Sequence, residues 1–247
     1  MKAHVHDPPP GRRRAQPAEP PQRRDRDFIA TASHDLRTSL GALQATLELL
    51  REEALRGRAD PDQTVGYLEM ALGQTRSLIR LTTDLLDITR LDAEVPLALE
   101  PVDVRELARA TRDEVAARLE ADDRRATVDG GPAVALAGRA AVGRILRILL
   151  DNAAAYGDGT VTVTVSHDDD SILVTVADEG AGIAPDEREL VFDRFARGRS
   201  AAGAPNGAGL GLAIARGLAQ AMGGDVDVAP ARGGAQFRLT LRAGPEP

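Results

Sequence analysis

Apolar residues in the first third of the chain recur at the spacing of α-helices. From Phe28 to about Arg56 they alternate in steps of four and three, which is a heptad pattern. The seam consists of Ile29, Ser33, Leu36, Leu40, Leu43, Leu47 and Leu50. The segment "RGRADP" ends this pattern, and Asp60 is placed to cap a second helix from Pro61 to Asp92. The pattern therefore predicts a helical hairpin.

The second helix carries an apolar surface that is too wide for one partner. One stripe consists of Val65, Leu68, Leu72, Thr75, Ile79, Thr82 and Leu86, and a neighbouring one of Leu78, Leu81, Leu85 and Ile88. Two hairpins packed as a four-helix bundle can cover both stripes. We expect a homodimer through the hairpin, because a lone hairpin would leave a large apolar surface in water.

The pattern changes to mixed helices and strands after residue 92. We expect a Pro-punctuated linker at 93–102, and helices at 103–119, 139–156 and about 209–222. The segments "TVTVTVS" and "SILVTVAD" alternate with period two around the turn "HDDD", which indicates a hairpin, and two more strands are expected near 225–229 and 235–242. This order predicts an α+β sandwich over 103–243, with one mixed sheet and helices on one face.

The N-terminal segment differs from the rest of the chain. Residues 1–24 are dominated by Pro, Arg and polar residues, so we expect a disordered tail before a helical domain at 25–92. No apolar run approaches the ~18–20 residues needed to cross a bilayer, and no N-terminal signal peptide is evident. We therefore expect a soluble chain without a membrane span, in the cytoplasm.

Composition narrows the chemistry further. The 247 residues carry a formal net charge of −7 and only 2% aromatic residues, which argues against nucleic-acid binding. The absence of Cys removes disulfides, thiolate nucleophiles and Cys-ligated zinc, and it fits a reducing compartment. Lys2 is the sole lysine, which excludes a Walker-type P-loop lysine from the folded part.

Two glycine-rich segments suggest a nucleotide site. In "DEGAGIAP", Asp178 ends an apolar strand, and its carboxylate can accept a hydrogen bond from an exocyclic amine while Gly180 and Gly182 let a planar ring approach the main chain. An ordinary strand-to-loop turn explains the segment equally well. In "NGAGLGLAIARGLAQAMGG", Gly207, Gly209 and Gly211 lead into an apolar helix whose first N–H groups attract phosphate, although a flexible loop has the same pattern.

Two further segments carry polar groups beside apolar ones. In "RILLDNAAAYG", Asn152 lies on an amphipathic helix, and its amide oxygen is a suitable Mg²⁺ ligand or else a satisfied polar group of the helix. In "VFDRFARGR", we interpret Phe192 and Phe195 as packing residues, and Arg194 and Arg197 as surface charges or phosphate clamps.

The order of these motifs is more specific than any one of them. A His-acid pair on a helix ("SHDLRT"), an Asn helix, D-x-G-x-G, F-x-R-F and G-x-G-x-G follow one another between about Arg26 and Leu241. This arrangement resembles the sensor histidine kinases of two-component systems. The resemblance implies a dimerisation and phosphotransfer hairpin followed by a Bergerat-type (GHKL) ATP-binding domain.

The resemblance also implies roles for individual residues. His34 would accept the γ-phosphate, Asp35 would act as general base, and Thr38 would position a water for the reverse hydrolysis of a phosphorylated regulator. The implied ATP-site residues are Asn152, which would also hold Mg²⁺, Tyr156, Asp178, which would bind the adenine amino group, Gly180, Gly182, Arg197, Gly207, Gly209, Leu210 and Gly211. Residues 196–206 would form a mobile lid. The implied cofactors are ATP and Mg²⁺, and the implied partner is the receiver domain of a response regulator.

The chain departs from the family pattern at three positions. Ser39 stands where many relatives have Pro, Ile148 replaces a polar residue of the metal site, and Ala155 replaces a Lys. Arg147 and Arg197 are nearby cations that could compensate. Ile148 and Ala155 motivate an alternative function, a kinase-weak ATP-binding and phosphatase module that controls a response regulator. A serine kinase of the anti-sigma type is a more distant alternative, because those proteins lack the His-bearing hairpin.

The position of His34 can be judged from the heptad register. Ser33 and Leu36 face the seam, so His34 is expected just off it, toward solvent. An exposed neutral imidazole offers a ring nitrogen lone pair near pH 7. The pattern thus argues against a buried core histidine.

Overall fold

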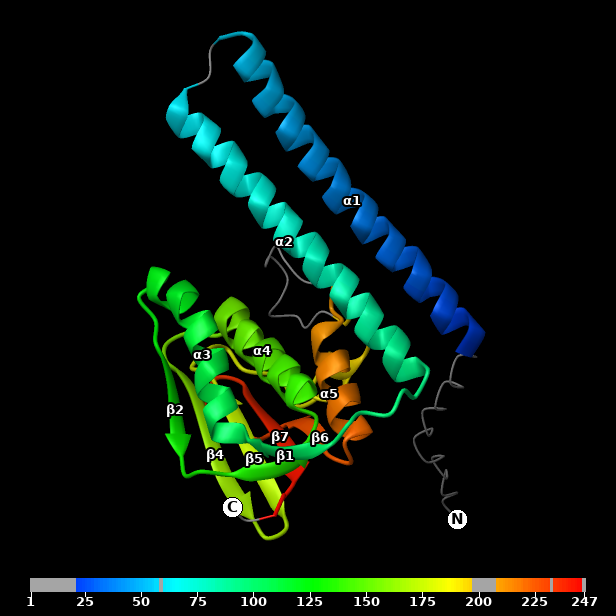
Figure 1. Ribbon diagram of the computed structural model, residues 1–247, viewed down its shortest axis with the longest axis vertical. Helices are drawn as coiled ribbons and strands as arrows, with labels where there is room; N and C mark the ends of the chain where they lie inside the picture. Colours follow the sequence, from blue (N-terminus) through cyan, green and yellow to red (C-terminus); the bar gives the residue numbers. More distant parts are fainter. Residues whose placement is uncertain (1–20, 58–59, 197–207, 232, 246–247) are drawn as a thin grey trace, which may run out of the picture.

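The computed structural model describes residues 21–57, 60–196, 208–231 and 233–245. Its first two elements are α1 (Pro21–Leu55) and α2 (Pro61–Asp92), which form a long antiparallel hairpin (Figure 1). The predicted second helix is confirmed at both ends. The Asp60 side chain caps it by accepting a hydrogen bond of 3.1 Å from the Asp62 N–H, which satisfies one of the free donors of the first turn.

The start of α1 corrects the sequence prediction. The helix begins at Pro21 rather than at Phe28, so residues 21–24 are its first turn and not part of a disordered tail. Proline is tolerated in the first turn of a helix, and the following Gln and Arg residues are good helix formers without being apolar. The apolar pattern begins only at Phe28, so it could not reveal the polar residues that form the start of the helix. The predicted tail at residues 1–20 lies outside the described residues.

The rest of the chain forms a sheet covered by helices. Its elements are β1 (Glu100–Asp103), α3 (Val104–Ala121), β2 (Ala126–Gly130), β3 (Val134–Ala137), α4 (Arg139–Tyr156), β4 (Val161–Asp168), β5 (Ser171–Ala177), the 3₁₀ turn η1 (Leu190–Phe192), α5 (Gly211–Ala221), β6 (Asp225–Val228) and β7 (Gln236–Arg242). The main sheet has the order β2-β4-β5-β7-β6; β2 and β4 are parallel and the other pairs antiparallel. The helices α3, α4 and α5 cover one face (Figure 1), which confirms the predicted sandwich.

Three short strands escaped prediction, and one of them lies in the predicted linker. β1 pairs with β3 in a separate two-stranded antiparallel sheet, and β2 forms an edge of the main sheet. Within β1, Val102 is 1% exposed, so residues 100–102 belong to the packed domain rather than to the linker at 93–102. These three strands were missed because their pairing depends on partners elsewhere in the chain. The helix α5 begins at Gly211, two residues later than expected.

One hydrophobic core joins the sheet domain to the base of the hairpin. Ile145, Leu149 and Ile214 of the helices are fully buried over the sheet. Leu81 and Ile88 of α2 belong to the same buried cluster, and Leu36 of α1 packs at its margin. The sheet domain therefore contacts the hairpin mainly through α2, as Figure 1 shows.

The upper part of the hairpin is packed on one side only. On α1, Leu43 and Leu50 are half-buried, whereas Leu40 and Leu47 remain exposed. On α2 the exposed members of the first predicted stripe are Val65, Leu68, Leu72, Ile79 and Leu86, with 45–60% of each side chain accessible. The second stripe supplies the buried Leu81 and Ile88. None of the described helices is both long and apolar enough to cross a membrane.

Candidate functional site

His34 lies on the surface of α1, as the heptad register predicted. One turn later, the Thr38 hydroxyl donates a hydrogen bond of 3.0 Å to the His34 carbonyl oxygen, so its side chain lies against the helix backbone. The side chain of Asp35 lies outside the described part of the structure. The helix continues without interruption through Ser39, which, unlike Pro, keeps its backbone N–H.

The carboxylate of Asp178 is buried at the end of β5. It is 8% exposed, and its Oδ1 accepts hydrogen bonds from the Gly180 N–H at 2.9 Å and from the Ala235 N–H at 3.0 Å. The Asp178 N–H in turn donates to the Ala235 carbonyl at 3.0 Å. Within the described residues these side-chain bonds all use Oδ1. The backbone thus fixes the orientation of the carboxylate and leaves Oδ2 to accept from a ligand amine.

The glycines after Asp178 are required by close backbone contacts. Gly182 has φ +75°, and a Cβ there would lie 2.6 Å from the Gly234 carbonyl oxygen. A Cβ on Gly180 would lie 2.9 Å from the Cα of Gly157. No side chain fits at either position, so the loop packs backbone against backbone. A cavity of about 230 Å³ adjoins the loop, between Gly182 and the turn that leads into β7.

Asn152 and Tyr156 lie in the last two turns of α4. Asn152 is half-buried and Tyr156 is 39% exposed. The turn that follows α4 is held against the Asp178 loop, because a Cβ on Gly157 would lie 2.5 Å from the Asp178 Cβ. At the other side of α4, a Cβ on Gly211 would contact Ile148 at 3.2 Å. The structure therefore brings the Asn helix, the Asp178 loop and the start of α5 together.

The second glycine segment is only partly described. Gly209 has φ +67°, and a Cβ there would lie 2.7 Å from the Ala196 carbonyl oxygen. Leu210 is 1% exposed, so its side chain is part of the core and only its backbone is offered to a ligand. Arg197 and Gly207, which the sequence also assigned to the ATP site, lie outside the described residues, as does the predicted lid beyond residue 196.

The arginine at position 147 has another partner. It forms an ion pair with Glu114 of α3, which directs its guanidinium toward α3. The two departures at Ile148 and Ala155 remain apolar: Ile148 is half-buried against the start of α5, and Ala155 is exposed. The structure therefore gives no support to Arg147 as a replacement for the missing polar groups.

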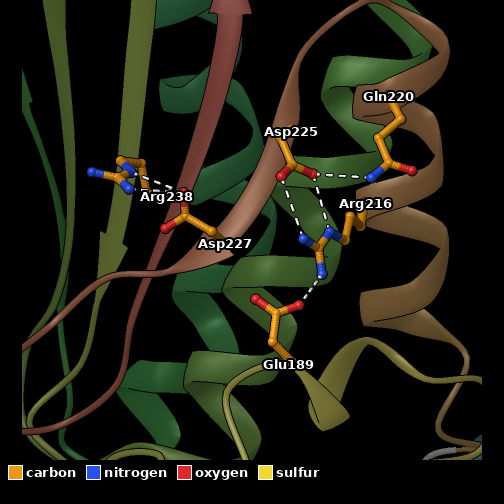
Figure 2. Close-up of polar contacts among 6 residues, drawn as sticks. All are labelled: Glu189, Arg216, Gln220, Asp225, Asp227 and Arg238. Atoms are coloured by element: carbon orange, nitrogen blue, oxygen red, sulfur yellow. Dashed lines mark hydrogen bonds and ion pairs between the residues drawn. The ribbon is translucent and has the colours of Figure 1, made fainter. Parts of the chain in front are cut away.

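A polar cluster around Arg216 was missed by the sequence analysis. Figure 2 shows its guanidinium between two carboxylates, with Nε 3.1 Å from Asp225 Oδ1 and Nη1 2.9 Å from Glu189 Oε2. These hydrogen bonds raise the pKa of Arg216. The guanidinium also stacks 4.8 Å from the centre of the Phe192 ring, which packs edge-on against Phe237. The cluster holds the segment before residue 193 on α5. The signal that could have revealed it is Arg216 itself, the one charged residue of α5.

A second missed feature is the polar contact between α2 and the sheet domain. Arg144 of α4 forms ion pairs with Asp84 and Asp87, the latter at 3.1 Å. Burial raises the pKa of Asp84 to about 6, with Asp87 adding to the rise and Arg144 opposing it. Burial outweighs the favourable ion pair because removing a carboxylate from water costs more than one partly exposed cation returns. A further hydrogen bond of 3.1 Å joins Arg194 to Asp92 at the end of α2.

Comparison with known proteins matches both parts of the chain. Residues 24–94 match the His Kinase A (phospho-acceptor) domain, and residues 138–245 match the histidine kinase-, DNA gyrase B- and HSP90-like ATPase domain. The histidine-protein kinase AfsQ2 of Streptomyces coelicolor is 36% identical over 90% of this chain and 42% of its own length. The probable sensor histidine kinase TcrY of Mycobacterium tuberculosis is 34% identical over 87% of this chain and 45% of its own. The chain thus spans less than half the length of these relatives.

Solved structures agree with these matches. The mycobacterial sensor histidine kinase MprB has 31% identity and a TM-score of 0.53, covering 60% of this chain and 99% of that chain. Full-length ShkA in complex with AMPPNP has 30% identity and a TM-score of 0.65, covering 89% of this chain and 47% of that chain. The histidine kinase AdeS of Acinetobacter baumannii, at 21% identity and a TM-score of 0.68 over 86% of this chain and 98% of that chain, shares the fold. The chain belongs to the sensor histidine kinases, with a phospho-acceptor hairpin and an ATPase domain of the gyrase and HSP90 type.

Proposed function

We propose that the chain is an ATP-dependent protein-histidine kinase that phosphorylates His34 and passes the phosphoryl group to an aspartate on the receiver domain of a separate response regulator. The observation that carries the proposal is the buried, backbone-held carboxylate of Asp178 in the same chain as an exposed histidine on α1. We assign the chain to the cytoplasm, and its functional units to the hairpin at 21–92 and the sheet domain at 100–243, with a connection at 93–99.

The nucleotide would lie across three segments: the loop after β5, the start of α5 and the turn after α4. Asp178 Oδ2 would accept a hydrogen bond from the adenine amino group, and Gly180 and Gly182 would let the base approach the backbone. The N–H groups at Gly209, Leu210 and Gly211 would bind the phosphates at the start of α5. Tyr156, Arg197 and Gly207 complete the proposed site.

Asn152 is the residue that would hold Mg²⁺. It is half-buried in the last two turns of α4, and the described residues contain no group of three or more His, Cys, Asp or Glu that could hold a metal ion. One amide suits Mg²⁺, which takes few protein ligands when phosphates and waters supply the others. When bound, Mg²⁺ supplies charge neutralisation to the triphosphate.

The transfer itself requires little covalent chemistry from the protein. A ring nitrogen lone pair of His34 forms the bond to the γ-phosphorus, and the bond from that phosphorus to the bridging oxygen breaks, which releases ADP. Asp35 accepts the proton that the other ring nitrogen loses. In the structure the sheet domain contacts the hairpin mainly through α2, whereas His34 lies on α1.

We also propose that the chain acts as a homodimer through its hairpin. The exposed stripe on α2 contains five apolar side chains, with two threonines among them, and none of the five belongs to the sheet domain's core. Packing two such stripes into a four-helix bundle would remove them from water.

A phosphatase activity is the second candidate function. The observation in its favour is the apolar character of positions 148 and 155, where polar groups would otherwise assist the triphosphate. MprB of Mycobacterium avium, 37% identical over 76% of this chain and 36% of its own length, is named a histidine-protein kinase/phosphatase. Thr38 would position the attacking water. The serine-kinase alternative finds no support, since the phospho-acceptor domain matches residues 24–94.

Labelling with γ-³²P-ATP tests the main proposal. Wild type should acquire an acid-labile label, and His34→Gln should acquire none, because the nucleophilic ring nitrogen is gone. His167→Gln is the matched control: it removes another exposed histidine, on β4, and should label normally. Label that persists in His34→Gln, or a wild type that binds ATP without labelling, contradicts the proposal.

A further inference from the structure

Arg124 occupies a defined place between α3 and β2. The last turn of α3 closes with the Arg124 N–H donating to the Leu119 carbonyl at 2.8 Å. Asp123, just before it, has φ +55°, a conformation that Asp adopts more readily than most residues. This turn directs the half-buried Arg124 side chain toward the end of α4.

The guanidinium of Arg124 binds three backbone carbonyls near that end. Nη2 donates to Ala153 at 3.0 Å, Nη1 to Ala154 at 2.9 Å and Nε to Gly159 at 3.1 Å. The Ala153 carbonyl also accepts from the Gly157 N–H at 3.0 Å. The carbonyls at the end of a helix carry partial negative charge, so a cation there is favourable. Other arginines behave differently: Arg216 and Arg238 bind carboxylates of flexible side chains (Figure 2). Arg124 instead fixes the main chain itself.

The segment that Arg124 binds, residues 153–159, lies between two proposed nucleotide-binding residues, Asn152 and Asp178. Asn152 directly precedes the first clamped carbonyl. After the clamp, the Glu179 N–H donates to the Asp158 carbonyl at 3.0 Å, and the Thr160 N–H lies 3.3 Å from Glu179 Oε2. The end of α4 is therefore held from one side by Arg124 and from the other by the residue next to Asp178.

We propose that Arg124 is a positioning residue of the nucleotide site, which fixes the end of α4 so that the Asn152 amide stays directed at the phosphate-bound metal ion. The inference rests on the proposed function. A purely stabilising helix cap is the simpler explanation, and it predicts that loss of Arg124 lowers thermal stability without a selective effect on metal-dependent binding. Positioning of Asn152 predicts that the effect is concentrated in the binding of Mg-ATP.

Calorimetric titration of the full chain with ATP separates the two explanations. The titration is run in Mg²⁺ and in EDTA, well below the unfolding midpoint of every variant. Arg124→Gln should weaken Mg-ATP binding by about 10-fold or more, because hydrogen bonds from a charged donor are lost. The loss of ATP affinity in this variant should be smaller in EDTA, since Asn152 then has no metal ion to bind. The Mg-ATP affinity of Arg124→Lys should lie between those of wild type and Arg124→Gln, because a lysine ammonium group cannot reproduce the forked hydrogen bonds of a guanidinium.

Arg125→Gln is the matched control. Its side chain is exposed beside Arg124, and Mg-ATP affinity should stay within about twofold of wild type. A folded Arg124→Gln with wild-type affinity overturns the inference, and so does an equal loss in Mg²⁺ and EDTA. Where Arg124→Gln does not fold, Arg124→Lys decides: it should bind Mg-ATP about threefold more weakly, and wild-type affinity overturns the inference. A wild type that binds no Mg-ATP overturns the proposed function and this inference with it, whereas binding that Arg124 does not affect overturns this inference alone.

Discussion

The hairpin and the sheet domain bury their apolar residues in different ways. In the sheet domain, Leu149 of α4 and Ile214 of α5 are fully buried against strands of the same chain. On the hairpin, Leu72 and Ile79 of α2 are 53% and 60% exposed, although they belong to an equally regular stripe. A periodic apolar pattern therefore predicts that a surface is buried, but it does not show which element or which chain covers it. The sheet domain buries its apolar residues within the chain, whereas the stripe on the hairpin would be buried by the proposed second copy.

The largest expected effect on stability comes from the sheet core. Leu149→Ala should lower the free energy of unfolding by about 2–5 kcal/mol, because it leaves a cavity among atoms that cannot collapse around it. Urea unfolding followed by circular dichroism measures the change. Leu55→Ala at the exposed end of α1 is the control and should cost less than about 1 kcal/mol. Equal losses in the two variants would remove the distinction between the domains.

The next prediction tests whether the apolar stripe on α2 forms the proposed dimer interface. Ile79→Glu should weaken dimerisation about 100-fold or more, because a carboxylate would be buried without a partner in the proposed bundle. Sedimentation equilibrium measures the dissociation constant. Thr83→Glu adds the same charge to an exposed position of α2 outside both stripes and should leave dimerisation nearly unchanged. A dimer that tolerates Ile79→Glu would show that another surface pairs the chains.

The smallest effect concerns the contact between the two regions. Because burial raises the pKa of Asp84 from 3.8 to about 6, the folded state binds a proton that the unfolded state releases. The contribution of Asp84 to stability is therefore fully present below about pH 4 and declines as the pH rises through about 6. Asp84→Asn, which mimics the protonated carboxyl, should reduce the pH dependence of the unfolding midpoint between these values. An unchanged pH dependence in Asp84→Asn would contradict the raised pKa of Asp84. The control variant is Asp129→Asn, at an exposed position, which should leave the pH dependence as in wild type.

Prediction succeeded where the chain repeats a local pattern. The second helix of the hairpin has the predicted bounds because Asp60 and Pro61 mark its start and a long apolar stripe continues behind them. The helix at 139–156 and the hairpin of β4 and β5 were found for the same reason. Local periodicity is a property of consecutive residues, so it needs no knowledge of partners.

Prediction failed where a structure depends on distant partners. β1 looked like a linker because two prolines punctuate the segment that contains it, and only pairing with β3 orders it as a strand. Arg124 and Arg216 were not singled out in the sequence, because their acceptors come from other elements. Conversely, the Asp178 and glycine motif could be read from the sequence, since Asp178, Gly180 and Gly182 lie within five consecutive residues and the positive φ of Gly182 favours glycine.

The sequence by itself determined that the chain consists of a helical hairpin and an α+β domain, and it identified the order of motifs that marks the family, because helix and strand periods and tight glycine turns are local properties. Only the tertiary structure decided that the sheet domain rests on α2, that Arg144 meets two aspartates there, and that Arg124 closes the helix carrying Asn152. These features arise between segments brought together by burial of a shared core. Their free energy depends on distances and solvent exposure that no linear pattern contains.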